Sequence, residues 1–216
     1  MEFASPIVCV VDDDDTVRHS IERLLKSSGY DALSFASANE FISHVSEEEP
    51  SCLVLDVRMP GLTGIELQND LRSRHPDLPI VFVTGHGDIP MSVKAIKNGA
   101  VDFLQKPFED HELLDAIRNA IEIFEARKSL RKKLSVIENR ISSLTRREYQ
   151  VFTLVVTGLL NKQIAGILGV TEKTIKVHRG RLMKKMEVVS LAELVLAAER
   201  TKVATGDIDL IAGELR

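Results

Sequence analysis

Five short apolar segments, separated by stretches long enough to form a helix, constrain the fold of this chain more than any other feature. The segments are IVCVV (7–11), ALSF (32–35), CLVLDV (52–57), IVFVTG (80–85) and VDFLQ (101–105). Parallel strands need long crossover connections, usually helices, and they are buried on both faces, so their sequences are apolar throughout. We therefore predict an α/β, doubly wound, five-stranded parallel sheet with helices on both faces.

The stretches between these segments carry helical periodicity. In TVRHSIERLLKSSG (16–29), the apolar residues Val17, Ile21, Leu24 and Leu25 recur at helical spacing, and Gly29 is typical of a helix end. This alternation of strand and helix predicts that ligands bind beyond the carboxyl ends of the strands.

A long helical pattern runs from about Glu109 to Ser142 and carries a short heptad seam. The seam residues are Leu130, Leu134, Ile137, Ile141 and Leu144. The pattern leaves two interpretations open: a linker helix that packs on its own domain, or a coiled-coil contact in a dimer. The basic stretch RKSLRKK (127–133) interrupts the apolar stripe and weakens the coiled-coil interpretation.

The third region has the signals of four short helices. The capping-box signatures are Thr145 with Glu148 and Ser190 with Glu193, the expected N-caps between them are Asn161 and Thr171, and the expected stops are Gly158 and Gly169. We therefore divide the chain into an α/β domain (1–122), a linker helix (123–142), an all-α domain (143–204) and a tail (205–216).

Charge is distributed unevenly between the two domains. Residues 1–109 carry 9 Lys and Arg against 18 Asp and Glu, a net charge of −9, whereas residues 141–204 carry 11 against 5, a net charge of +6. This asymmetry indicates an acidic module joined to a basic one that binds a polyanion. Cys9 and Cys52 lie in apolar segments, which favours two buried free thiols in a reducing cytoplasm. We expect neither a signal peptide nor a membrane span.

Acidic residues follow two of the predicted strands. Asp12 and Asp13 come directly after the first strand, and Asp56 lies near the end of the third. Because the carboxyl ends of parallel strands meet at one edge of the sheet, these carboxylates are expected to lie close together, with Lys106 from the end of the fifth strand. Crowded carboxylates raise one another's pKa unless a cation compensates, so the sequence predicts a Mg²⁺ site.

This predicted site also suggests a reaction. A carboxylate such as Asp56 can attack phosphorus when Mg²⁺ and the Lys106 ammonium neutralise the transferring group. The product would be an aspartyl phosphate. Thr84, at the end of the fourth strand, could then donate a hydrogen bond to a phosphate oxygen.

The segments VVDDDD, LDVRMPGLTGIEL, VTGHGD and DFLQKPF, in this order, resemble the receiver domain of bacterial two-component response regulators, which has a flavodoxin-like fold. The resemblance implies Asp56 as the phosphoacceptor and Lys106 as the cation that pairs with the phosphate. It also implies a Mg²⁺ site made by Asp12, Asp13, Asp56 and the backbone carbonyl of Arg58, and a switch pair of Thr84 and Phe103. Asp14 and Asp15 are better interpreted as capping acids of the first helix.

Residues 144–201 resemble the LuxR-type helix-turn-helix, and the combination resembles the FixJ/NarL class of transcription regulators. The second helix of the motif, within TEKTIKVHRGRLMKKM, is expected to enter the major groove. We expect base contacts from Lys176 and Val177, and phosphate contacts from Thr174, Arg181 and Lys184. Lys173 and Gly180 share this face, although the lack of a side chain at Gly180 puts base recognition there in doubt.

The resemblance implies a phosphorylation-controlled transcription regulator, an activator in the commoner case, with no enzymatic activity beyond its own phosphotransfer and dephosphorylation. Its expected partners are a sensor histidine kinase, promoter DNA, RNA polymerase and, on phosphorylation, a second copy of the chain. The alternative is a haloacid-dehalogenase-type phosphatase, since Asp12 to Thr16 satisfies its DxDx(T/V) pattern. The later acidic pair of that family is incomplete here, because Gly87-Asp88 is followed by Ile-Pro-Met-Ser.

Overall fold

The structure is a computed structural model that describes residues 5–45, 50–85 and 89–202. By its internal contacts the chain divides into two compact units, Met1–Ser129 and Leu130–Arg216, and each unit is described separately. No helix within the described ranges is long and apolar enough to cross a membrane.

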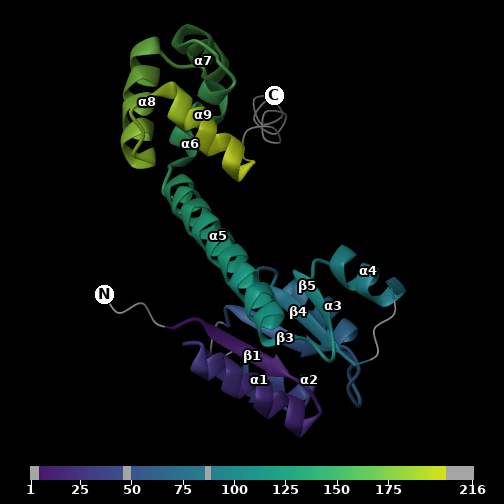
Figure 1. Cartoon of the computed structure of the whole chain (residues 1–216). Coiled ribbons are helices and arrows are strands. Elements are labelled where there is room, and N and C mark those ends of the chain that lie inside the picture. Colours follow the sequence, from purple (N-terminus) through teal and green to yellow (C-terminus); the bar gives the residue numbers. More distant parts are fainter. Residues whose placement is uncertain (1–4, 46–49, 86–88, 203–216) are drawn as a thin grey trace. The chain divides into compact units, whose positions relative to one another are not determined.

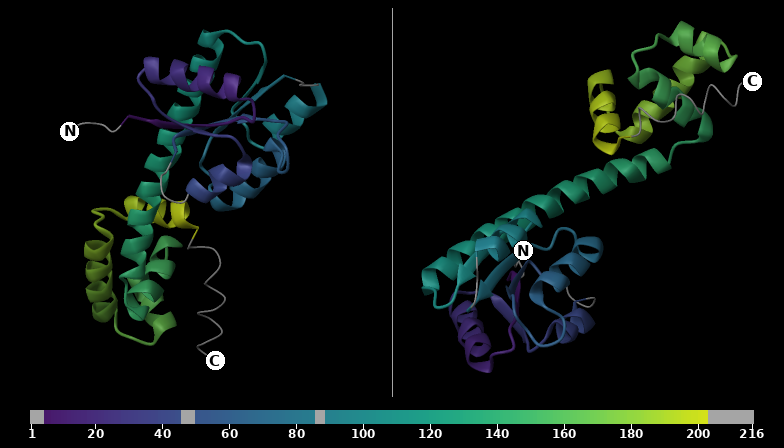
Figure 2. Two further views of the ribbon diagram at one scale, coloured as in Figure 1. Left: turned by 90° about the horizontal axis from the view of Figure 1, so that it is seen from below. Right: turned by 90° about the vertical axis from the view of Figure 1, so that its right-hand side faces the viewer.

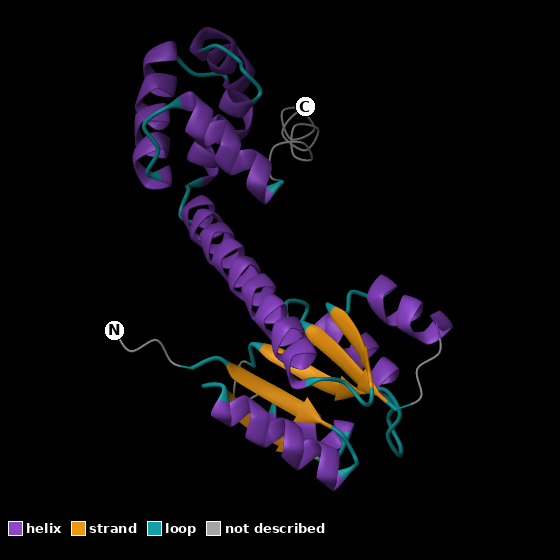
Figure 3. Cartoon of the chain, viewed as in Figure 1, coloured by secondary structure: helices purple, strands orange, loops and turns teal. Residues whose placement is uncertain are grey.

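The first unit contains the expected five-stranded parallel sheet (Figures 1 and 3). Its strands are β1 (Ile7–Val11), β2 (Asp31–Phe35), β3 (Cys52–Asp56), β4 (Ile80–Thr84) and β5 (Asp102–Gln105). They lie in the order β2-β1-β3-β4-β5, and every neighbouring pair is parallel. The apolar segments of the sequence therefore identified all five strands.

Helices cover both faces of this sheet, as the edge-on view in Figure 2 shows. The helices of this unit are α1 (Asp15–Ser27), α2 (Ala38–His44), α3 (Gly64–Arg74), α4 (Ile89–Lys97) and the first part of α5 (Asp110–Ser142). The α1 and α5 helices pack on one face through Ile21, Leu25, Leu113 and Ile117. The other face is covered by α2, α3 and α4. The arrangement is the predicted doubly wound fold.

The capping acids of the opening DDDD stretch behave as expected. Asp14 is the N-cap of α1, and its carboxylate accepts hydrogen bonds from the backbone N–H groups of Thr16 (2.8 Å) and Val17 (3.2 Å). Asp15 lies in the first turn and pairs with Arg18. Cys9 and Cys52 are buried free thiols, and burial raises the pKa of Cys52 far above its usual range.

The second unit is the predicted bundle of four short helices. They are α6 (Arg146–Val156), α7 (Asn161–Leu168), α8 (Glu172–Met186) and α9 (Leu191–Thr201). Their common core includes Phe152, Ile164, Ile175, Leu182 and Leu194, all fully buried. Thr145 forms the predicted capping box with Glu148, and Thr171 caps α8.

The predicted N-cap of α7 was wrong. The helix begins at Asn161, so its N-cap is Leu160, whose backbone N–H donates to the Gln163 side chain at 2.8 Å. The Asn161 side chain instead accepts a hydrogen bond from Arg179 at 3.2 Å. The Asn161 side chain therefore makes a tertiary contact with Arg179 and does not cap the helix.

The residues of the heptad seam differ in burial along α5. Ile137, Ile141 and Leu144 pack against the core of the second unit, whereas Leu130 is 56% exposed. The last turns of α5 therefore pack on the helical unit. The tail (205–216) and the Gly87-Asp88 pair lie outside the described residues.

Candidate functional site

The buried charges of the first unit lie where three strands end. In β1 and β3 the side chains that face α1 and α5 alternate along the strand, and Asp12 and Asp56 continue these two rows at the carboxyl edge. Lys106 follows β5 in the same way, after Leu104. The alternation of strand side chains therefore brings Asp12, Asp56 and Lys106 to one face and one edge.

One ammonium group joins the two carboxylates. Lys106 Nζ lies 2.5 Å from Asp12 Oδ2 and 3.0 Å from Asp56 Oδ1. The remaining oxygens accept backbone hydrogen bonds, from Asp14 N–H to Asp12 Oδ1 (3.0 Å) and from Arg58 N–H to Asp56 Oδ2 (2.7 Å). The structure therefore brings Lys106 together with both carboxylates at this edge.

Burial dominates the electrostatics of Asp56, which is only 5% exposed. Desolvation raises the pKa of Asp56 above its usual value, the Lys106 ammonium opposes that rise, and the nearby Asp12 carboxylate adds to it. For Lys106, burial lowers the pKa, but pairing with Asp12 and Asp56 outweighs burial and the pKa is raised. The site therefore holds more negative charge than one lysine can compensate.

Asp13 and Arg58, the other expected Mg²⁺ ligands, lie at the same edge and are exposed. As they stand, no three His, Cys, Asp or Glu side chains of the described ranges form a metal-binding group. The donor set nevertheless fits Mg²⁺ by chemistry, because carboxylate and carbonyl oxygens are its preferred ligands. It also fits by charge, because the carboxylates of Asp12 and Asp56 share the single ammonium of Lys106, and Asp13 adds a further negative charge at the same edge.

The expected switch pair lies on the opposite face of the sheet. Thr84 continues the row of Ile80 and Phe82, and it is 1% exposed. Phe103 packs in the same cluster, with its ring centroid 6.3 Å from that of Phe82. The strand register pairs Phe82 with Phe103 and Thr84 with Gln105, so Thr84 and Phe103 lie on adjacent strands and share a face.

Two residues that support the site were missed by sequence reasoning. The buried Arg18 donates from Nη1 to the backbone carbonyl of Asp12 at 2.7 Å, and so holds the first acidic turn. Gly64 begins α3 beside Asp56, and a Cβ atom at Gly64 would lie 2.2 Å from the Asp56 carbonyl oxygen. The signal for Arg18 was its position three residues before Ile21, on the buried stripe of the helix.

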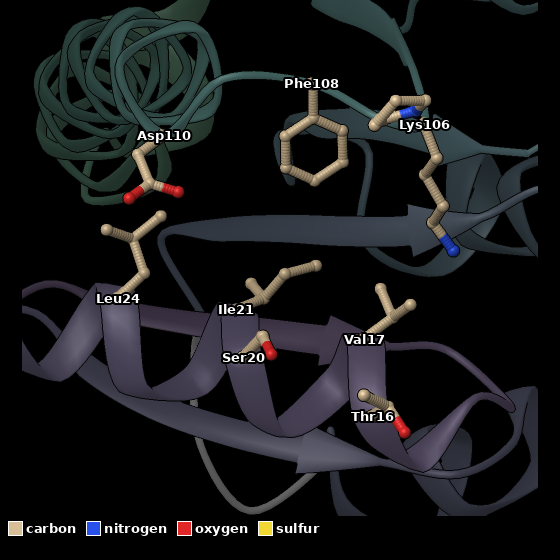
Figure 4. A pocket seen from close by; sticks show the side chains of 9 residues that line it. Thr16, Val17, Ser20, Ile21, Leu24, Lys106, Phe108 and Asp110 are labelled. Atoms are coloured by element: carbon tan, nitrogen blue, oxygen red, sulfur yellow. The ribbon is translucent and has the colours of Figure 1, made fainter.

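A groove adjoins Lys106 between α1 and the segment that leads from β5 into α5 (Figure 4). It has a volume of about 480 Å³, and Val17, Ile21, Leu24 and Phe108 form its apolar walls. Lys106 reaches from the rim of this groove toward the two carboxylates. The sheet edge that carries Asp12 and Asp56 is thus bordered by an apolar surface.

In the second unit, helix α8 has one buried and one exposed face. Ile175, Leu182 and Met186 are buried in the core. The expected DNA-contacting face is exposed at Lys173, Lys176, Val177, Gly180, Arg181 and Lys184, and half-buried at Thr174. The Thr174 hydroxyl bonds to that of Thr171 at 2.8 Å, so it takes part in the helix cap.

Ion pairs fix the carboxyl end of α8. Lys185 Nζ lies 2.6 Å from Glu148 Oε2 and donates to the Ser143 carbonyl at 3.0 Å. Arg140, in the last turns of α5, donates to the Met186 carbonyl at 3.2 Å and pairs with Glu187. The pKa of Glu148 is lowered to about 2, first by Lys185 and then by the Thr145 backbone N–H. These contacts attach the carboxyl end of α8 to its own unit.

Two protein families match the chain, one in each unit. The response regulator receiver domain matches residues 8–118, and the bacterial regulatory proteins of the luxR family match residues 142–198. These matches agree with the phosphoacceptor-like edge and the exposed basic helix. Neither family is a phosphatase, so the phosphatase alternative has no support.

Similar proteins extend this assignment to nearly the whole chain. Nodulation protein W of Bradyrhizobium diazoefficiens is 47% identical over 193 residues, which are 89% of this chain and 85% of that protein. The solved structure of response regulator StyR is 49% identical, covers 91% of this chain and 100% of its own, and gives a TM-score of 0.80. Full-length FixJ from B. japonicum is 40% identical, covers 93% and 98%, and gives a TM-score of 0.57. The chain therefore belongs to the family of two-component response regulators that join a receiver domain to a LuxR-type helix-turn-helix, and it is a transcription regulator of the FixJ type.

Proposed function

We propose that Asp56 accepts a phosphoryl group from a sensor histidine kinase and that this modification controls DNA binding by helix α8. The observation that carries the proposal is the Lys106 ammonium, which bridges the buried carboxylates of Asp12 and Asp56. In the proposed domain organisation, residues 1–122 form the receiver, residues 123–142 form the linker helix and residues 143–204 form the DNA-binding domain. The chain acts in the cytoplasm, where its two thiols stay reduced and promoter DNA is accessible.

In the proposed reaction a carboxylate oxygen of Asp56 attacks phosphorus, and the bond between phosphorus and the donor's histidine nitrogen breaks. The Asp56 carboxylate is held for this step by the Arg58 N–H on one oxygen and Lys106 on the other. When the phosphoryl group arrives, the Lys106 ammonium can transfer its hydrogen bond to a phosphoryl oxygen and neutralise developing charge.

Asp12, Asp13, Asp56 and the Arg58 carbonyl are the residues that would hold Mg²⁺. The bound ion would supply charge neutralisation and orient the phosphoryl oxygens. Arg18 supports this arrangement, because its bond to the Asp12 carbonyl keeps the acidic turn in place.

Thr84 and Phe103 are proposed as the switch that reports the modification. Thr84 would turn its hydroxyl toward a phosphoryl oxygen, and Phe103 would move into the space that Thr84 vacates. Their shared face of the sheet and adjacent strands support this coupling. The expected result is a changed surface near α4 and β5 and formation of a homodimer.

The groove beside Lys106 is proposed as the contact surface of the phosphodonor protein. A donor must bring its phosphohistidine to Asp56, and the apolar walls at Val17 and Leu24 lie at the edge it must approach. We expect Leu24→Gln to slow phosphotransfer from the kinase, while modification by acetyl phosphate stays unchanged because that donor needs no protein contact. Equal slowing with both donors would contradict the assignment.

On the DNA side, α8 is proposed to enter the major groove, with Lys176 and Val177 on base edges and Lys173, Thr174, Arg181 and Lys184 on phosphates. Gly180 would allow close approach, since nothing lies within 4 Å of the position a Cβ would take there. One module of this size reads few base pairs, so two copies on paired half-sites are expected. RNA polymerase is the expected further partner of an activator.

The proposal is tested by incubating the full chain with acetyl phosphate and Mg²⁺ and measuring intact mass, oligomeric state and operator binding together. We expect a mass gain of one phosphoryl group, dimer formation and tighter operator binding, all of which Asp56→Asn abolishes. Asp115→Asn is the matched control, because Asp115 is an exposed acid of the same unit. A mass gain that persists in Asp56→Asn would contradict Asp56 as the acceptor.

A further inference from the structure

A second cavity lies at the opposite end of the sheet from Asp56. Its volume is about 320 Å³, within the range of small-molecule sites. Ile80, the first residue of β4, lines this cavity, whereas Thr84 ends that strand at the edge that carries Asp56. Thr84 lies four positions after Ile80 along the strand, and this spacing corresponds to ~13 Å. The cavity is therefore distinct from the phosphoacceptor site.

The lining of this cavity combines an apolar floor with a cationic rim. Leu71, Leu78 and Ile80 form the floor, and Arg72 and Arg127 are the charged residues of the rim. The described lining residues include no Asp or Glu, and neither arginine has an ion-pair partner within the described part of the chain. Two guanidinium groups without a protein counter-charge favour a phosphate or carboxylate, whose oxygens match their fork of N–H donors.

Gln68 adds an acceptor to this cationic surface. It lines the cavity and is 1% exposed. Its Nε2 donates to the Ala95 carbonyl at 3.2 Å, and because only the amide nitrogen can donate, this bond fixes the orientation of the amide. Within the described structure Oε1 then has no hydrogen-bond partner. A buried acceptor of this kind favours a ligand that brings an O–H or N–H donor.

We propose that this cavity, between α3, the end of α4 and α5, binds a small anion that also carries a hydrogen-bond donor, such as hydrogen phosphate or a hydroxylated organic phosphate or carboxylate. Arg72 and Arg127 bind the anionic oxygens, and Gln68 accepts from the donor. Asn98 and Gly99, just beyond α4, complete the wall. This site is separate from Asp56 and needs no Mg²⁺.

The test uses hydrogen phosphate and sulfate as matched probes, because both are small tetrahedral oxyanions but only hydrogen phosphate carries a proton to donate. Isotope-labelled full-length protein is titrated with each anion at constant ionic strength and without Mg²⁺, and the signals followed are the Gln68 side-chain amide and the Asn98 and Gly99 backbone amides. We expect saturable shifts with phosphate and binding of sulfate that is roughly fivefold weaker or more.

Three test variants and one control separate the parts of the proposal. Arg72→Gln and Arg127→Gln should each weaken phosphate binding roughly tenfold. Arg74→Gln is the control, since Arg74 lies on the same helix, pairs with Asp70 and does not line the cavity, and it should leave binding unchanged. Gln68→Met should reduce phosphate binding to the level of sulfate.

Three results would overturn the proposal. The first is a titration in which the shifts of these amides do not saturate below about 0.1 M phosphate. The dissociation constant would then be too high for a specific site. The second is equal binding of phosphate and sulfate by the native chain, a comparison that holds even if Gln68→Met does not fold. The third is an Arg74→Gln effect as large as that of Arg72→Gln, which would indicate a general response to charge.

Discussion

In the receiver unit the charges at the candidate site are buried, with Asp12 at 1% and Asp56 at 5% exposed. In the DNA-binding unit the corresponding charges, such as Lys176 and Lys184, are exposed on one face of α8. The buried site depends on neighbouring backbone and on a single compensating cation, so small changes there affect folding and chemistry together. The exposed face depends on long-range attraction to a polyanion, so changes there should be graded and sensitive to salt.

The largest effect is expected from Gly64→Ala. The added Cβ would lie 2.2 Å from the Asp56 carbonyl oxygen, so strand β3 or helix α3 must shift. We expect a loss of at least ~2 kcal/mol in the free energy of unfolding of the receiver unit, together with slower modification of Asp56. Urea unfolding followed by circular dichroism and intact mass after acetyl phosphate treatment measure the two effects.

Gly166→Ala in helix α7 is the matched control, because an added Cβ there would meet no atom of the described chain within 4 Å outside its neighbours and its own helix backbone. That variant should be as stable as the native chain or more so. Similar losses of stability in both variants would show that the receiver site is no more tightly constrained than the helical unit.

The comparison of Lys176→Ala with Lys184→Ala tests the exposed face. We expect Lys176→Ala to reduce discrimination between operator and unrelated DNA by roughly tenfold, since it removes the proposed base contact, and such contacts are worth ~1–3 kcal/mol. Lys184→Ala should weaken both DNAs alike and reduce the salt dependence by about one counterion. Measuring DNA binding of the phosphorylated protein at several salt concentrations gives both the discrimination between DNAs and the salt dependence. Equal changes in these two quantities for the two variants would contradict the assignment of base recognition to Lys176.

A smaller effect is expected from Glu148→Gln, which removes the buried carboxylate that pairs with Lys185. The folded pKa of Glu148, about 2, lies below its ordinary value of 4.5, so the carboxylate stabilises the fold above pH 4.5. This contribution is lost as the pH falls toward 2. We expect Glu148→Gln to cost about 1–2 kcal/mol at pH 7 and much less at pH 3, as measured by thermal unfolding. A difference that does not change with pH would mean that packing, and not the pair with Lys185, is what the variant loses.

The smallest expected effect is that of Gly180→Ala on α8. Glycine in a helix interior costs up to ~1 kcal/mol relative to alanine, and the added Cβ meets no atom of the protein. We therefore expect a gain of ~0.5–1 kcal/mol in stability of the helical unit. If operator binding weakens at the same time, close approach of DNA to Gly180 is supported, whereas unchanged binding would contradict it.

Much of the fold could be predicted because its signals are local. The five apolar segments identified five strands, and Thr145 with Glu148 identified the start of α6, since the partners of a capping box are three residues apart. Asn161 was misassigned because its local capping signal competed with a contact to Arg179, 18 positions away. The cavity at Gln68 had no sequence signal, because its walls come from α3, β4, α5 and two connecting segments that lie far apart in the sequence.

The sequence by itself determined the order of strands and helices, the residue types at each strand end and the polarity of α8, because periodicity and composition are properties of neighbouring residues. Only the tertiary structure decided which charges meet. Lys106 pairs with Asp12 across 94 positions, and Lys185 reaches the Glu148 carboxylate across 37. Those contacts depend on the register of strands and the packing of helices, and these are set by burial of the whole core.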